Sequence, residues 1–214
     1  MDRLPRGRHG LSPEFVARNQ RERLIAGLIS ALYEVGYQKT TVSIIGQRAA
    51  VSKSDFYKHF ETKDECFIAA YDLSIERIRE CVTVACEAAS AEEWPRRVQV
   101  STGALLELLS SDPALASIAL VEGLRAGREV YDRYQSALDL FVGYLNEGAP
   151  VSNPGGDVPE ATGEAVIGGI ASLLGRRVLA GEAENLNDLF PEILEFVLSA
   201  YLGAEQARRI ISDG

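Results

Sequence analysis

Apolar residues recur at intervals of three and four along most of the 214-residue chain, a spacing typical of amphipathic helices. The pattern predicts a first helix from Phe15 to Val35, which Gly36 ends, and two short helices at Val42–Ala49 and Lys53–Phe60. A long helix is expected from Thr62 to about Ala89. We find no persuasive set of alternating strands joined by hairpin turns. The sequence therefore predicts an all-α protein.

The second half of the chain predicts longer helices separated by polar breaks. We expect helices over about 94–109, 120–145, 159–180 and 187–202, with the tail either continuing the last helix or fraying. Ser90 and Glu93 have the spacing of a capping box before the first of them, and Asp112 before Pro113 marks a break. Residues 146–159 are rich in Gly, Pro and Asn, and are the clearest loop.

The two short helices are the most informative part of the sequence. Thr40 or Thr41 can cap the first, Ser52 can cap the second, and Thr62 with Glu65 forms a capping box at the start of the long helix. Two capped short helices separated by a few residues have the layout of a helix-turn-helix unit. In such a unit the second helix enters the major groove of DNA, while the first lies across the backbone.

The residue types in this unit suit contact with DNA. The start of the second helix offers groups that can bond to base edges, and its end offers donors for phosphate oxygens. The base-facing candidates are Ser52, Lys53, Ser54 and Asp55, and the phosphate candidates are Thr41, Tyr57, His59 and Lys63. Taken singly, each has an ordinary alternative: Tyr57 as a core aromatic, His59 as a helix cap, and Lys63 as a solvated residue.

Residues 36–67, GYQKTTVSIIGQRAAVSKSDFYKHFETKDECF, resemble the DNA-binding motif of the TetR family of transcriptional regulators. The matching positions are Gly36, Thr40-Thr41, Ile45, Val51-Ser52, Tyr57-Lys58-His59-Phe60 and Lys63-Asp64-Glu65. The resemblance implies that Thr41, Tyr57, His59 and Lys63 hold the DNA backbone. It also implies that Ser43, Gln47, Lys53, Ser54 and Asp55 read or adjoin bases. The chain departs from the usual pattern with Ala50 in place of Gly, Gly46 in place of Ala and Cys66 in place of Leu.

The charge is divided unevenly along the chain, whose net charge is −9. Residues 1–63 contain eleven Lys and Arg against six Asp and Glu, net +5, and residues 64–214 contain eleven against twenty-five, net −14. A basic N-terminal third on an acidic body suggests that one part binds a polyanion, although the acidic residues could simply keep the body soluble. The basic leader RLPRGRHG, residues 3–10, is either an arm that follows DNA or a disordered tail.

Composition argues against several other classes of protein. Cys66, Cys81 and Cys86 have no CxxC spacing, and with only two histidines the sequence predicts reduced thiols and no metal site. We find no nucleophile–base pair and therefore expect no catalytic residue and no cofactor. No apolar run is long enough for a membrane span, and the N-terminal residues lack a secretory signal, so we expect a cytoplasmic protein.

For the acidic body, the resemblance implies a helical domain that binds an effector and forms a dimer. Candidate pocket residues are Trp94, Leu105, Leu109, Glu122, Arg125, Tyr131 and Tyr134. Aromatic stripes of this kind can equally be plain core, and the charged residues can form a solvated face. Candidate dimer residues are Ile167, Ile170, Leu174, Leu189, Ile193, Phe196, Val197 and Tyr201 on the last two helices, unless these stripes face their own core.

Taken together, these interpretations predict a basic arm at 1–13, a helix-turn-helix domain at 14–62 and an effector-binding and dimerisation domain at 63–214. The expected function is transcriptional regulation, most simply as a homodimeric repressor that an unknown small molecule releases from a palindromic DNA operator. A helical protein-interaction adaptor and, less favoured, an enzyme on a helical scaffold are the alternatives. The sequence identifies neither the operator nor the effector.

Overall fold

A computed structural model describes residues 12–124 and 127–213 of the chain. The fold is all-α, as the sequence predicts, with one small hairpin. The elements in chain order are α1 (Pro13–Lys39), α2 (Val42–Ala49), α3 (Lys53–Phe56), α4 (Lys63–Ala88), α5 (Trp94–Ser111), α6 (Pro113–Leu120), the 3-10 helix η1 (Glu122–Leu124), α7 (Arg128–Asn146), β1 (Ser152–Asn153), β2 (Gly156–Asp157), α8 (Thr162–Leu179), the 3-10 helix η2 (Ala183–Leu189), α9 (Phe190–Leu202) and α10 (Ala204–Asp213).

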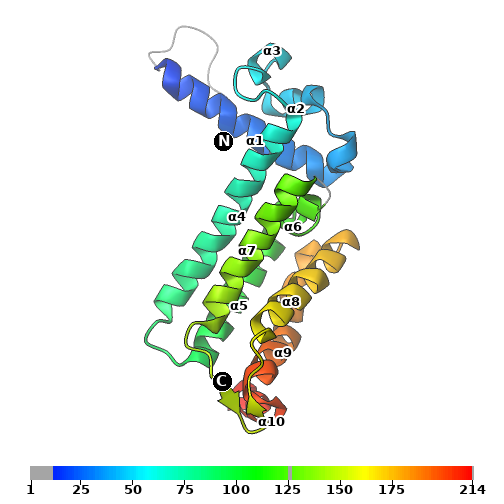
Figure 1. The fold of residues 1–214 in the computed structure, drawn as a ribbon. Coiled ribbons are helices and arrows are strands. Elements are labelled where there is room, and N and C mark those ends of the chain that lie inside the picture. Colours follow the sequence, from blue (N-terminus) through cyan, green and yellow to red (C-terminus); the bar gives the residue numbers. More distant parts are fainter. Residues whose placement is uncertain (1–11, 125–126, 214) are drawn as a thin grey trace.

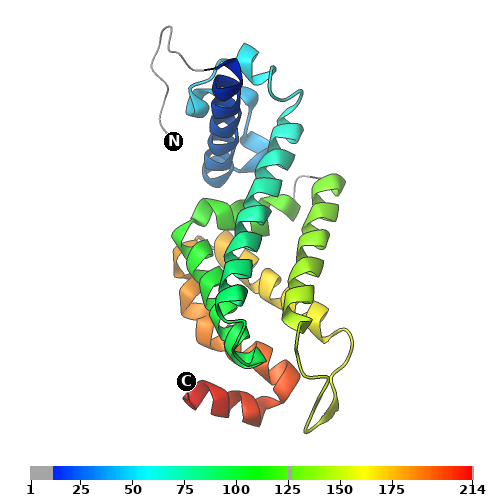
Figure 2. The ribbon, with the colours of Figure 1, turned by 90° about the vertical axis from the view of Figure 1, so that its left-hand side faces the viewer.

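The helices form a head and a body that α4 joins. Helices α1, α2 and α3 make the head at one end of the molecule, and α4 runs from the head along the length of the body (Figure 1). Seen from the side, α5 to α10 gather around the lower part of α4, with α10 at the end far from the head (Figure 2). Helix α6 packs against α1 and is therefore the main body element that touches the head.

Two hydrophobic cores correspond to the head and the body. The head core contains Leu24 and Leu28 of α1, Phe56 and Phe60 around α3, and Phe67 from the first turns of α4, all at most 2% exposed. Burial of a Phe side chain stabilises a fold by about 1.5–3 kcal/mol, so the two Phe residues anchor the short α3 to the rest of the head. The start of α4 thus belongs to the head core, although α4 continues into the body.

The first half of the chain closely follows the sequence prediction. Helix α2 has the predicted bounds, and Thr62 caps α4 by accepting a hydrogen bond from the Glu65 amide at 3.1 Å. Gly36 interrupts the helical path of α1 with a φ of 73°, which glycine adopts at little cost. Helix α3 is shorter than expected, because after Phe56 the chain continues as a tight turn that reaches Phe60.

Two predictions for the second half were wrong. The single helix over 120–145 is instead α6, η1 and α7, with Gly123 and Gly127 in the break. A Cβ atom on Gly123 would lie 2.6 Å from the Tyr71 ring, and Gly127 has a φ of 102°. Helix α5 begins after Glu93 and not after Ser90, so the expected capping box is absent, and Pro95 lies in the first turn, where its missing N–H costs little. The expected loop at 146–159 contains the β1–β2 hairpin.

The tail after Leu202 neither continues α9 nor frays. Gly203, with a φ of 84°, ends α9, and the chain starts again as α10. No single helix in the described residues is long and apolar enough to cross a bilayer. Trp94–Ser111 and Pro113–Leu124 pass that test when the two segments are taken together, by length and composition alone, but they are bent by 108°.

Candidate nucleic-acid interface and internal cavity

Side-chain caps fix where α2 and α3 begin. The Thr41 hydroxyl accepts a hydrogen bond from the Ile44 amide at 3.3 Å, and the Ser52 hydroxyl accepts one from the Asp55 amide at 3.0 Å. Both cap residues are extended, as N-cap residues should be. Thr41 and Ser52 are therefore structural caps whatever else they contact.

The turn between α2 and α3 carries strain at one residue. Ala50 has φ 50° and ψ 44°, a left-handed conformation that strains any residue with a Cβ atom. Arg23 of α1 holds this turn by donating hydrogen bonds to the carbonyl oxygens of Ala49 and Ala50. Val51, the next residue, is buried at 7% exposure, so the turn is held by the Arg23 bonds before it and by the packing of Val51 after it.

Replacing Ala50 with glycine is expected to stabilise the protein by about 0.5–1 kcal/mol. Relief of the left-handed strain, about 1–2 kcal/mol, exceeds the larger entropy that glycine loses on folding, about 0.5–1 kcal/mol. Urea denaturation measures the change. Ala26→Gly, the same substitution at an exposed position inside α1, serves as the control and should destabilise by about 1 kcal/mol. If Ala50→Gly were less stable than the wild type, the claim that Ala50 is strained would be contradicted.

The outer side of α3 faces solvent while its inner side is anchored. Phe56 is 0% exposed, whereas Tyr57 on the adjacent turn is 51% exposed. The DNA-contact residues predicted from the sequence lie together on this part of the head. Those that are exposed are Thr41, Ser43, Gln47, Ser52, Lys53, Ser54 and Tyr57. Asp55, His59 and Lys63 are only half-buried. The geometry thus leaves a polar helix surface free to lie in a groove.

Asp55 bonds to its own helix. One of its carboxylate oxygens accepts a hydrogen bond from Lys58 Nζ at 2.7 Å, and the other accepts one from the Ser52 hydroxyl at 2.7 Å. These bonds lower the pKa of Asp55, so the carboxylate is charged at neutral pH. A DNA base that bonded to Asp55 would have to share its carboxylate with Lys58 and Ser52. Lys58, which the motif comparison did not assign to DNA, is highly exposed beside it.

His59 is turned toward α1. Its Nε2 atom lies 3.1 Å from the Gln20 side-chain oxygen, and the Arg21 guanidinium lies over the neighbouring Phe60 ring at 5.0 Å. Burial lowers the pKa of His59, and Arg21 lowers it further, while Asp55 opposes the shift. His59 is therefore mostly neutral at pH 7. Arg21 is a cation beside α3 that sequence reasoning missed, because α1 lies outside the short motif.

The lowered pKa of His59 predicts that folding stability falls as the pH drops through the ordinary histidine value of about 6.5. Below that pH the unfolded chain binds the proton more tightly than the folded chain, so acid favours unfolding. The thermal midpoint measured at pH 7.5 and at pH 5.5 checks this, with His59→Gln as the matched variant. The wild type should lose more stability than His59→Gln over this interval. An equal loss in both proteins would contradict the prediction.

Lys63 is bound to its own domain. Its Nζ atom donates a hydrogen bond to the Tyr37 carbonyl oxygen at 3.1 Å and lies 3.8 Å from the centre of the Tyr37 ring. Its role as a phosphate contact remains a prediction, and any phosphate would have to compete with Tyr37. The basic arm predicted at the N-terminus lies almost entirely outside the described residues.

An apolar cavity of about 400 Å³ lies inside the body, between α4, α5, α7 and α8. Four of the pocket residues predicted from the sequence line it: Trp94, Leu105, Leu109 and Tyr134. The lining also includes Ile75, Phe141, Ile167 and Ile170, which are packed against the body core. The half-buried Arg97 and the exposed Glu87 and Glu147 stand at the end far from the head. The cavity therefore suits an apolar molecule with a polar end.

Two other predicted pocket residues, Tyr131 and Glu122, do not line this cavity. Tyr131 is 46% exposed on the outside of α7, and Arg125 lies outside the described residues. Glu122 is 4% exposed, and its carboxylate accepts a hydrogen bond from the Tyr37 backbone amide at 3.0 Å. Helical spacing alone could not separate these positions, because the break at η1 turns α7 onto a different path from α6.

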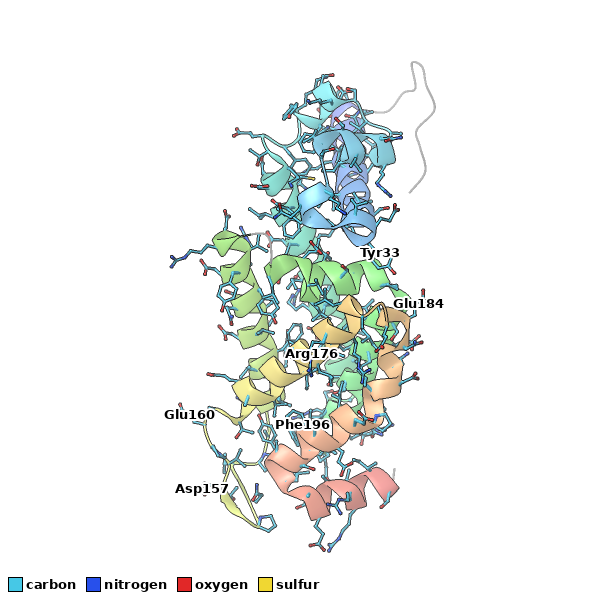
Figure 3. All side chains as sticks on the ribbon, turned by 90° about the vertical axis from the view of Figure 1, so that its right-hand side faces the viewer. Tyr33, Asp157, Glu160, Arg176, Glu184 and Phe196 are labelled. Atoms are coloured by element: carbon cyan, nitrogen blue, oxygen red, sulfur yellow. The ribbon has the colours of Figure 1, made fainter. Side chains whose placement is uncertain are left out.

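Most of the predicted dimer stripe faces the subunit's own core, the alternative that the sequence left open. The buried members are Leu174, Leu189, Ile193, Val197 and Tyr201, each at most 7% exposed. Ile167 and Ile170 line the cavity. Phe196 is 50% exposed, and Figure 3 shows it with Arg176 on the face that α8 and α9 form. Phe196 thus remains as a dimer candidate from that list.

Helices α2 and α3 are short, capped and separated by a tight turn, and two buried Phe residues hold the polar side of α3 outward. This arrangement defines a helix-turn-helix protein. Residues 24–70 match the family model described as bacterial regulatory proteins, tetR family. The chain therefore carries a TetR-family DNA-binding domain, which confirms the resemblance seen in its sequence.

Solved structures with the same fold cover most of the chain. The fatty acid degradation regulator FadR from Bacillus halodurans is 16% identical with a TM-score of 0.72, covering 89% of this chain and 97% of its own. FadR from Bacillus subtilis, solved with stearoyl-CoA, is 19% identical with a TM-score of 0.66, covering 84% and 98%. A TetR-like regulator from Rhodococcus is 15% identical with a TM-score of 0.64, covering 86% and 96%. No match to a curated protein was found.

Proposed function

We propose that this regulator is a homodimeric repressor that binds a palindromic operator and leaves it when a small molecule fills the cavity. The observation that carries the proposal is the outward, polar surface of α3, which is held by Phe56 and Phe60 from below. Helix α4 begins in the head and lines the cavity in the body, so one rigid element touches both sites. The cytoplasm, where bacterial DNA lies, is the proposed location.

The DNA side of the proposal follows from the size of the groove. A major groove about 12 Å wide admits one α-helix, and α3 is the helix that projects from the head (Figure 1). Two copies related by a two-fold axis would read two half-sites about 34–36 Å apart. We propose that Lys53, Ser54 and Tyr57 contact DNA directly, with Ser43 and Gln47 of α2 beside them.

The dimer side of the proposal rests on the exposed face of α8 and α9. Phe196 and Leu179 are 50% and 58% exposed there, and the Phe196 ring lies close to Gly169, where a small residue leaves a shallow surface. Large apolar side chains exposed on one face are typical of interaction surfaces. Two such faces packed against each other would form a four-helix bundle between the subunits.

The ligand we propose is long and mostly apolar. The cavity is lined along α4 from Tyr71 to Glu87, sixteen residues apart, a distance of about 24 Å at the helical rise of 1.5 Å per residue, and Ser90 lies just beyond the end of α4. Apolar groups line most of this length, and polar groups gather at the Ser90 end. A long-chain acyl compound fits this shape, and the B. subtilis FadR structure contains stearoyl-CoA. The lining contains no histidine, and we propose action by binding and not by catalysis.

Binding to DNA from the region upstream of its own gene tests the proposal. The protein should retard this DNA at low salt, and affinity should fall about 10³–10⁵-fold between 50 and 200 mM salt if six to ten phosphates are contacted. Stearoyl-CoA should then release the DNA, whereas free CoA, which lacks the apolar chain, should not. Absence of retardation at low salt would contradict the regulatory role. Equal effects of the two compounds would contradict the ligand class.

A further inference from the structure

Tyr37 is held from two sides, and the two sides belong to different parts of the molecule. Its backbone N–H donates to the Glu122 carboxylate of η1 in the body at 3.0 Å. Its carbonyl oxygen accepts from Lys63 Nζ at 3.1 Å, and its hydroxyl donates to the Asp64 carboxylate. Lys63 and Asp64 are the first residues of α4, a few positions after α3. One residue therefore joins the body to the helix start behind the DNA-reading surface.

The place of Tyr37 in the chain makes its position depend on these hydrogen bonds. It directly follows Gly36, where a φ of 73° interrupts the helix, so the Tyr37 segment is not fixed by a continuous helix before it. Its ring packs edge-to-face on Phe67 at 5.0 Å and lies under Lys63. A shift of Tyr37 would consequently move Lys63, Asp64 and the start of α4 together.

Glu122 connects in turn to the wall of the cavity. The next residue, Gly123, lies so close to Tyr71 that an added Cβ atom would be 2.6 Å from a ring carbon. Tyr71 is 0% exposed and lines the cavity, and its hydroxyl has no hydrogen-bond partner among the described residues. Packing alone therefore holds the Tyr71 ring, and a ligand that displaced the ring would press on η1.

We propose that Glu122 is the positioning residue that transmits occupancy of the cavity to the DNA-binding head, through its bond to the Tyr37 amide. The proposal rests on the regulatory function proposed above. The order of contact is cavity, Tyr71, Gly123, Glu122, Tyr37 and the start of α4. A carboxylate that accepts from a backbone amide in a buried setting makes a charge-assisted bond, which is stronger than a neutral one. The bond thus couples two bodies that otherwise meet mainly through α1 and α6.

The decisive variants are Glu122→Ala, which removes the acceptor, and Glu122→Gln, which keeps a carbonyl oxygen in its place. Without ligand, Glu122→Ala should bind operator DNA about 10-fold more weakly than the wild type, and Glu122→Gln should stay within about two-fold. Stearoyl-CoA should bind all three proteins equally. It should weaken DNA binding at least about five-fold in the wild type and Glu122→Gln, but less than two-fold in Glu122→Ala.

A purely structural role for Glu122 would change stability and leave the ligand's effect on DNA intact. Equal release by stearoyl-CoA in Glu122→Ala and the wild type, together with equal DNA affinity without ligand, would therefore overturn the proposal. If Glu122→Ala fails to fold, Gly123→Ala replaces it, because its Cβ pushes the Tyr71 ring while Glu122 stays. That variant should bind DNA more weakly without ligand, and unchanged binding would overturn the proposal.

Hydrogen exchange separates failure of this inference from failure of the proposed function. In protein without DNA or ligand, Glu122→Ala should raise the exchange rate about 10-fold at residues 37–41 and 57–65 relative to Glu122→Gln, and leave 98–108 unchanged. Unchanged exchange at 57–65 would overturn the inference even if the wild type binds DNA as expected. The predicted change would uphold the connection even if the wild type neither binds DNA nor responds to stearoyl-CoA.

Discussion

Replacing Lys53 and Tyr57 together with alanine is expected to lower operator affinity by about 100-fold or more without loss of stability. Each side chain that contacts a base or a phosphate contributes about 1–3 kcal/mol, and 1.4 kcal/mol is a factor of ten in affinity. Both side chains lie on the solvent side of α3, and Tyr57 is 51% exposed. Fluorescence anisotropy with labelled operator DNA measures the loss, and thermal unfolding measures stability.

The chain offers a matched control for this variant. Tyr33 is also 51% exposed and also lies in the head, but Figure 3 shows it on the side nearest the body, away from α3. Tyr33→Ala should therefore bind operator DNA within about two-fold of the wild type, since surface substitutions outside a contact change energies by less than about 0.5 kcal/mol. Equal losses in Tyr33→Ala and the double variant would show that α3 does not read the operator.

Replacing Phe196 with glutamate is expected to convert the proposed dimer to monomers at micromolar concentration and to abolish tight operator binding. In a two-fold interface the same substitution occurs twice, so two carboxylates would be buried against an apolar face without partners. Each monomer could then hold only one half-site. Sedimentation velocity measures the mass, and anisotropy with full and half operators measures the consequence for DNA.

Val84→Glu is the matched control for the dimer test. Val84 is 64% exposed and lies on α4, away from the α8–α9 face, so a charge there meets water and not a second subunit. This variant should remain a dimer with wild-type DNA affinity. A Phe196→Glu protein that remains dimeric would show that the subunits do not associate through the α8–α9 face.

The head could be predicted from sequence because its signals are local. Thr41, Ser52 and Thr62 each cap the helix that follows them, and a cap needs only an amide two or three residues away. Phe56 and Phe60, four residues apart, bury together as helical spacing requires. The family motif covers the same segment. Local signals were therefore enough to predict both the position of the helix-turn-helix unit and the surface that faces outward.

The body could be predicted only as a set of helices, because its arrangement depends on distant contacts. Gly123 lies in the break of the expected helix, where the Tyr71 ring, over fifty residues earlier in the chain, leaves no room for a Cβ atom. Leu174 and Ile193 have the apolar spacing of an interface and the same spacing as a core, and the structure places them in the core. Glu122 was predicted for the pocket but reaches Tyr37, a pairing that no local pattern could reveal.

Selection of bound sequences from random double-stranded DNA tests the central claim, that α3 reads DNA, most directly. The wild type and the Lys53→Ala, Tyr57→Ala double variant should be carried through identical rounds. We expect the wild type to enrich a palindromic sequence with half-site centres about 34–36 Å apart, and the variant to enrich none. Enrichment of the same sequence by both proteins, or of no sequence by the wild type, would contradict the claim.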